Sequence, residues 1–131
     1  MKYVVDTHAL LWFLADSSRL SAAADAALSE PGSDLVLPAT ALAEACWIVQ
    51  RGRVPLSVAD VLSALDADPR FTILPLTRTV IERSNSLTTI GEMHDRQIVA
   101  TTLLLIEGGE TVSLITADSN IVASSLAPIL W

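Results

Sequence analysis

Two aspartates stand where strand-like segments end. Asp6 directly follows the apolar pair Val4-Val5, and Asp118 comes two residues after the β-prone run 112–116. If both runs are parallel strands, the two carboxylates lie at the same edge of one sheet. Either residue can also be a plain turn or helix-cap aspartate, because Asp favours both positions.

Glu44 lies in a segment, residues 41–49, that is otherwise almost entirely apolar. Its neighbours at helical spacing include Ala41, Trp47 and Ile48, and this pattern predicts a buried helix. A buried charge is costly unless it is paired or bound to a metal. The alternatives for Glu44 are therefore a metal ion, a partner arginine, or an exposed ribbon along the helix.

Asp95 is expected in the first turn of a long helix, with Ile98 and Val99 on the same inward face. Its position near the helix N-terminus stabilises a negative charge, and this can be its only role. Arg96, next to it, could pair with Asp95, orient it, or contact a phosphate. The sequence leaves these alternatives open.

Four carboxylates that meet at one crevice need a cation. At an effective dielectric constant of about 20, two carboxylates roughly 5 Å apart repel by about 3 kcal/mol. Oxygen ligands without cysteine or histidine favour Mg²⁺ or Mn²⁺ over Zn²⁺. Such an ion can lower the pKa of a bound water and neutralise a phosphodiester in the transition state. The pattern therefore predicts hydrolysis of a phosphate ester.

The elements that must position these acids alternate between short β-prone runs and longer helical segments. Alternation of this kind predicts βαβ units and a parallel sheet covered on both faces, with all strand C-termini at one edge. Gly52 and Gly108-Gly109 are expected to end two helices, and Ser57 to begin another. Strands are expected over 3–5, 35–37, 71–74 and 112–116, with a possible edge strand in 126–131, and helices over 9–14, 21–28, 40–51, 57–66, 77–84, 94–107 and 120–125.

Composition narrows the class of protein. The chain has 131 residues, which suits one domain, 1–131, and its single cysteine excludes an intramolecular disulfide. No apolar run approaches the roughly 18 residues that cross a bilayer, and we expect a cytoplasmic protein. A net charge of −7 argues against a broad basic surface for nucleic acid. The apolar content of 51% suggests a partner or a dimer.

Four motifs, in order, resemble PIN-domain toxins of the VapC type. The first is the opening segment 4–12, Val-Val-Asp-Thr-His-Ala-Leu-Leu-Trp, and the second is Glu44 in a Leu-x-Glu setting. The third, residues 95–101, is similar to the family's Asp-Arg-x-Ile-x-Ala helix start. The fourth, residues 116–118, matches its Thr-x-Asp. The resemblance covers essentially the whole chain.

This resemblance implies an α/β, PIN-like three-layer fold, in which helices flank a central, mainly parallel sheet of four to five strands. It implies a Mg²⁺ or Mn²⁺ site made from Asp6, Glu44, Asp95 and Asp118, and endonucleolytic cleavage of RNA. It also implies a homodimer and a cognate VapB-type antitoxin that binds promoter DNA in the complex. The stretch 91–96 departs from the family by lacking a proline, and Glu92 is assigned no ligand role.

The remaining polar candidates receive supporting roles. Thr7 and Ser119 are expected to donate hydrogen bonds to the carboxylates, with Arg96 as a possible substrate contact. His8 is expected to pack or hydrogen-bond in the first loop, and His94 to face solvent. Cys46, Trp12 and Trp47 are expected in core or interface packing, and the arginines 51, 53, 78, 83 and 96 are candidate RNA contacts.

Two other functions stay open: a module that only binds a partner, and a PIN-type nuclease outside toxin–antitoxin systems. Two other phosphate-chemistry classes are disfavoured. A haloacid-dehalogenase-type phosphatase needs a second Asp at position 8, which is His. A receiver domain needs a lysine after a late strand, and the only lysine is Lys2.

Overall fold

The computed structural model describes all 131 residues. Short strands alternate with helices along the whole chain, as the sequence predicts. The strands are β1 Lys2–Val5, β2 Asp34–Pro38, β3 Phe71–Leu74, β4 Val112–Ile115 and β5 Ile129–Leu130. The helices are α1 Thr7–Leu14, α2 Ala22–Ser29, α3 Ala39–Gln50, α4 Val58–Ala67, α5 Arg78–Asn85, α6 Met93–Glu107 and α7 Ser119–Ser124.

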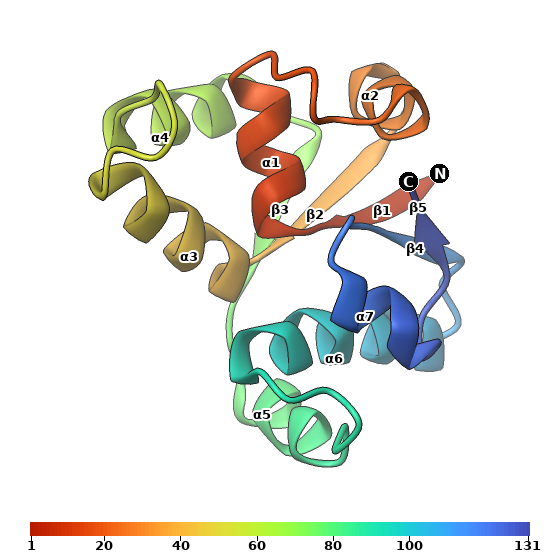
Figure 1. The fold of residues 1–131 in the computed structure, drawn as a ribbon. Helices are drawn as coiled ribbons and strands as arrows, with labels where there is room; N and C mark the ends of the chain where they lie inside the picture. The colour runs from red at the N-terminus through yellow and green to blue at the C-terminus, as the bar shows by residue number, and fades with distance from the viewer.

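All five strands form one parallel sheet in the order β3-β2-β1-β4-β5. The α/β three-layer fold expected from the sequence is confirmed: α1 and α2 lie on one side of the sheet, and α5 and α6 lie on the other (Figure 1). From β1 the chain builds the sheet outward through β2 and β3, then returns to add β4 on the other side of β1. The carboxyl ends of β1 and β4 therefore flank the point where the strand order reverses, which is where ligands bind in open α/β sheets.

The centre of the sheet is buried on both faces. Val4 and Val5 are adjacent in β1 and therefore point to opposite faces, yet both are fully buried, as are Leu114 and Ile115 in β4. Continuous burial of this kind explains why these strands read as uninterrupted apolar runs rather than alternating patterns. The two strands thus hold their carboxyl ends in a rigid frame.

Local signals begin and end the helices as expected. The Ser57 side chain caps α4 and forms a reciprocal capping box with Asp60. Gly52 follows α3 with φ +70°, and Gly109 follows α6 with φ +95°, a backbone region where other residues are strained. Each predicted helix lies within two residues of its observed bounds.

Helix α3 differs from the expectation of a buried helix. Thr40, Ala41, Ala45, Ile48 and Val49 are buried on one side. The opposite side is open, since Ala43, Trp47 and Gln50 are exposed. The small residues of this segment make it apolar in sequence, but they do not require that the helix be buried on every side. No helix in the structure is long and apolar enough to cross a membrane.

Candidate metal centre

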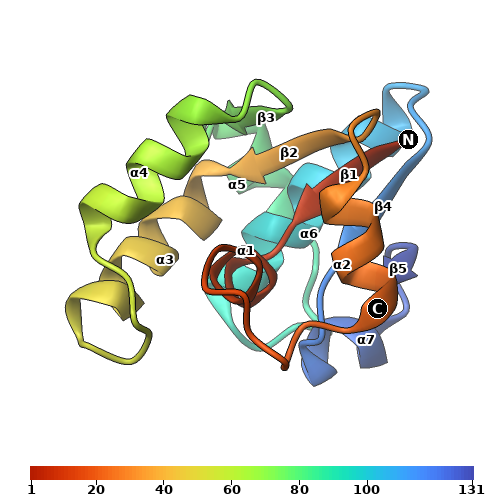
Figure 2. The same ribbon diagram turned by 90° about the horizontal axis from the view of Figure 1, so that it is seen from above.

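Asp6 occupies the junction between β1 and α1, two elements that follow each other directly in the ribbon of Figure 2. Its Oδ1 accepts a hydrogen bond of 2.7 Å from the Thr7 backbone N–H, and its Oδ2 accepts one of 2.5 Å from the Thr116 hydroxyl. The side chain is only 6% exposed. Burial raises the pKa of Asp6 above its usual value, against the opposing effect of these hydrogen bonds.

Thr116 links Asp6 to Asp118. Its hydroxyl donates to Asp6, and the same oxygen accepts a hydrogen bond of 3.0 Å from the Asp118 backbone N–H. Asp118 in turn caps α7, since its Oδ1 accepts hydrogen bonds from the backbone N–H groups of Asn120 and Ile121. The two aspartates thus lie at one edge of the sheet, joined by a fully buried side chain. The signal for Thr116 was a hydroxyl at the last position of the predicted strand 112–116.

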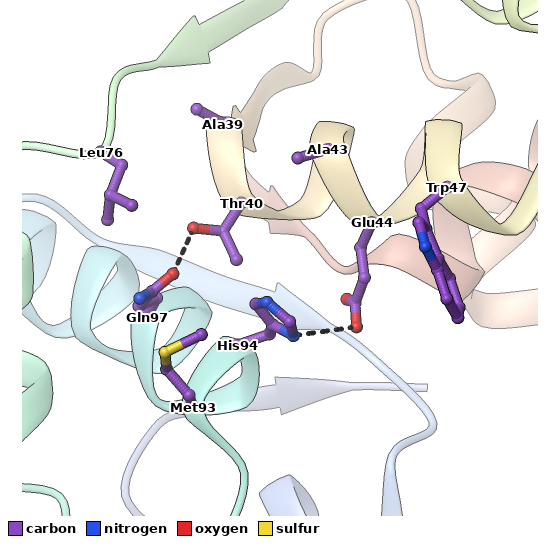
Figure 3. A pocket seen from close by; sticks show the side chains of 9 residues that line it. All are labelled: Ala39, Thr40, Ala43, Glu44, Trp47, Leu76, Met93, His94 and Gln97. Carbon is purple, nitrogen blue, oxygen red and sulfur yellow. Dashed lines mark hydrogen bonds and ion pairs between the residues drawn. The ribbon is translucent and has the colours of Figure 1, made fainter.

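Glu44 reaches the same edge from α3. Its Oε1 accepts a hydrogen bond of 2.6 Å from the Thr7 hydroxyl, and its Oε2 lies 3.7 Å from Nδ1 of His94 (Figure 3). The carboxylate is 28% exposed and therefore is not the buried charge that the sequence suggested. Thr7 holds both acids through different atoms, because its backbone N–H donates to Asp6 and its hydroxyl donates to Glu44.

Asp95 is a second carboxyl group of the centre with a raised pKa. It is half-buried in the first turn of α6. Burial, followed by the negative charges of Asp118, Glu92, Asp6 and Glu44, raises the pKa of Asp95 to about 7. The four predicted acids, which come from widely separated parts of the chain, therefore interact electrostatically at one place.

No lysine or arginine neutralises this cluster. Acids outside the cluster form the ion pairs of Lys2, Arg70, Arg78 and Arg83. Arg96 does not pair with Asp95: its Nε donates to the backbone carbonyl of Ile90 at 2.5 Å. The side chain of Ser119 makes no hydrogen bond to the acids. An oxygen-rich group of carboxylates with no compensating lysine or arginine is the setting that a divalent cation fits.

Two residues that the sequence did not assign belong to the same region. Glu92 caps α6, because its Oε2 accepts a hydrogen bond of 2.8 Å from the Asp95 backbone N–H. His94 Nδ1 lies 3.0 Å from Oε1 of Glu92. His94 faces solvent in part, as expected, but its half-exposed ring also lies between Glu92 and Glu44. Ligand atoms of Glu44, Glu92 and His94 all lie within 4.8 Å of one another.

The other sequence candidates lie outside the centre or at its border. His8 packs against Trp12, with ring centroids 5.5 Å apart, and Trp12 packs against Trp131. Trp47 is 53% exposed rather than in the core, and Arg51 lies 4.4 Å above its ring. Cys46 is half-buried in α3.

Comparison with known proteins identifies the family. The sequence profile of the PIN domain matches residues 3–125. The chain belongs to the PIN-domain family. Membership indicates a nuclease that depends on a divalent metal, and the carboxylates of the centre suit such an ion.

The PIN fold is also found among solved structures. One that resembles this PIN domain is VapBC2 from Rickettsia felis, determined bound to a DNA fragment from its promoter. The two share 15% sequence identity over 98% of this chain and 97% of the other, with a TM-score of 0.66. At this identity the likeness describes the fold. Comparison with curated protein sequences gives no significant match.

Proposed function

We propose that this PIN domain is a Mg²⁺- or Mn²⁺-dependent endoribonuclease and the toxin of a toxin–antitoxin pair. The observation that carries the proposal is Asp95, whose pKa is raised to about 7 by burial and by the surrounding acids. A carboxyl in this state gains most from a divalent cation, because the cation removes the repulsion that raises its pKa. The fold shared with the VapBC2 complex supports the toxin assignment.

Asp6, Asp95 and Asp118 would hold the ion, with Glu44 on the side of α3. When bound, a divalent cation lowers the pKa of a coordinated water and neutralises the scissile phosphate. The chain's own contribution is to hold the carboxylates in place: Thr116 orients Asp6 and Asp118, and Thr7 orients Asp6 and Glu44. Residues that orient metal ligands in this way commonly affect metal affinity strongly.

Positively charged side chains are needed to contact the RNA phosphates, and some of the arginines in this chain are already held in ion pairs. Arg78 and Arg83 are paired with Glu82 and Glu107. Arg19, Arg51 and Arg53 are exposed and form no ion pair, and of these Arg51 and Arg53 follow α3, the helix that carries Glu44. We therefore assign contact with the RNA phosphates to these two arginines, on the loop that follows α3. Trp47, beneath Arg51, is positioned one helical turn beyond Glu44.

A homodimer and an antitoxin are proposed as partners, because large apolar side chains remain exposed. Trp47, Leu76 and Met93 are 53%, 42% and 59% exposed, and they line one cavity of about 780 Å³ beside Glu44 (Figure 3). Exposed apolar surface that borders a functional centre usually marks an interface. A monomeric mass in solution, for the chain alone, would contradict the dimer.

Cleavage assays test the metal-dependent nuclease. We expect the purified protein to cut RNA with Mg²⁺ or Mn²⁺, to lose this activity in excess EDTA, and to regain it when the metal is restored. The products should be internal fragments on a sequencing gel. Full activity in EDTA would contradict the metal mechanism. Absence of cleavage across diverse RNAs, with metal bound, would favour a module that only binds a partner.

Expression in cells tests the toxin assignment separately. We expect induction of this chain to arrest growth, and co-expression of a small adjacent gene to restore it. That gene should encode a DNA-binding N-terminal half and an apolar, arginine-bearing tail. Metal-dependent cleavage in vitro without growth arrest would place the protein among PIN nucleases outside toxin–antitoxin systems.

A further inference from the structure

His94 is a nitrogen donor inside an otherwise oxygen-only centre. Its Nδ1 lies 3.0 Å from Oε1 of Glu92 and 3.7 Å from Oε2 of Glu44. Figure 3 shows the ring of His94 directed toward Glu44 across the gap between α6 and α3. One candidate ligand atom from each of the three residues falls within 4.8 Å of the others.

Each of the two glutamates accepts a hydrogen bond with one carboxylate oxygen and directs the other oxygen toward His94. Oε1 of Glu44 accepts from the Thr7 hydroxyl, which leaves Oε2 facing the ring. Oε2 of Glu92 caps the backbone N–H of Asp95, which leaves Oε1 facing the ring. The orientation of both carboxylates is therefore set by contacts outside the cluster, before any ion binds.

From these contacts we propose that Glu44, Glu92 and His94 form a cation position that selects Mn²⁺ and related transition-metal ions over Mg²⁺. The proposal rests on the metal dependence proposed above, and it adds a cation position beside the one held by Asp6, Asp95 and Asp118, with Glu44 contributing to both. Two carboxylates balance the charge of one divalent cation. Mg²⁺ takes oxygen ligands in strict octahedral geometry, whereas Mn²⁺ and Co²⁺ accept imidazole nitrogen more readily.

The competing explanation is that protonated His94 acts as an organic cation. It would then bridge Glu44 and Glu92 by charge alone and would make no bond to a metal. The two explanations differ in whether Nδ1 carries a proton or coordinates the ion. They can be separated without any measurement of RNA cleavage.

Metal titration is the first test, on metal-free protein with MgCl₂, MnCl₂ and CoCl₂ by calorimetry. We expect His94→Gln to weaken Mn²⁺ and Co²⁺ binding about tenfold, a typical loss when a metal site loses a well-placed partner. Mg²⁺ binding should change by less than about threefold, because Gln keeps the two carboxylates and supplies no nitrogen ligand. The matched control is His8→Gln, which alters the only other histidine; His8 is not in the cluster, so this change should affect the three affinities by the same small factor.

Pulsed EPR of bound Mn²⁺ is the second test, and it detects a directly coordinated nitrogen. Nitrogen hyperfine coupling is expected in the wild type and in His8→Gln, and its loss is expected in His94→Gln. Absence of this coupling in the wild type, or equal weakening of Mg²⁺ and Mn²⁺ by His94→Gln, would overturn the proposal. Selective binding with no RNA cleavage would instead leave this proposal standing and reject the nuclease.

Discussion

Replacing Asp95 by Asn is expected to have opposite effects on catalysis and on the stability of the metal-free protein. Cleavage should fall about 10³-fold, because a bound divalent cation supplies several kcal/mol of transition-state stabilisation and the variant loses a charged ligand. The metal-free protein should become more stable at pH 8. There the wild-type carboxylate is ionised among four other acids, whereas the amide is neutral.

The size of the gain in stability follows from the raised pKa. A pKa of about 7 against an unfolded value of 3.8 corresponds to about 4 kcal/mol if fully realised. Asp95 is half-exposed, so solvent screening reduces this to about 1–2 kcal/mol. Urea denaturation in EDTA at pH 8 measures it. Asp66→Asn, on the exposed side of α4, is the matched control and should change neither property.

A variant that loses activity and also loses stability would contradict this account. It would show that the Asp95 carboxylate supports the fold through its place in the first turn of α6, rather than opposing it through repulsion. Unchanged cleavage in the variant would remove Asp95 from the centre altogether.

The free energy of unfolding of the metal-free wild type is expected to fall as the pH rises from 5 to 8. The pKa of Asp95 is higher in the folded than in the unfolded state, as is that of Asp6. Folding is therefore favoured by these groups while they are protonated, and this contribution is lost as the pH rises through the folded pKa of about 7. After the same discount for exposure, the fall attributable to Asp95 is about 1 kcal/mol.

Bound metal should reverse this fall of the free energy of unfolding with rising pH. At a concentration of 100 times its dissociation constant, Mn²⁺ stabilises the folded state by about 2.7 kcal/mol, and it binds better as the carboxylates ionise. Denaturation curves at several pH values, with EDTA or with Mn²⁺, measure both effects. The Asp95→Asn variant should show a shallower pH dependence in EDTA. A steeper fall in that variant, or a rise in wild-type stability with pH, would contradict the expected sign.

Most element bounds could be predicted because they depend on short-range chemistry. Strand β3 matches its predicted range, since Pro75 follows it directly. Ser57 caps α4 as expected, and Thr77 caps α5 at the start of its predicted range, because a hydroxyl before a helical segment satisfies a free backbone N–H. The parallel sheet followed from the alternation of strands and helices. The order of the strands did not, because apolar runs of equal length do not specify which neighbour each will pair with.

The sequence predicted the four acids of the candidate centre one by one, but it did not predict which other side chains surround them. The structure brings Asp6, Glu44, Asp95 and Asp118 together. The sequence does not indicate Glu92 and His94, because a glutamate before a helix and a histidine in its first turn are ordinary at a helix N-terminus. Their significance depends on α3 crossing beside the start of α6, and no local pattern in the sequence encodes that crossing.

The position of β4 beside β1 also determines when this protein can first act. Asp6 precedes Asp95 and Asp118 by long stretches of chain, and Asp118 can reach Asp6 only once β4 has been made and pairs with β1. An incomplete nascent chain therefore has no assembled set of acids. The chemistry of the centre therefore becomes available only after the chain has been made through Asp118 and β4 has joined the sheet.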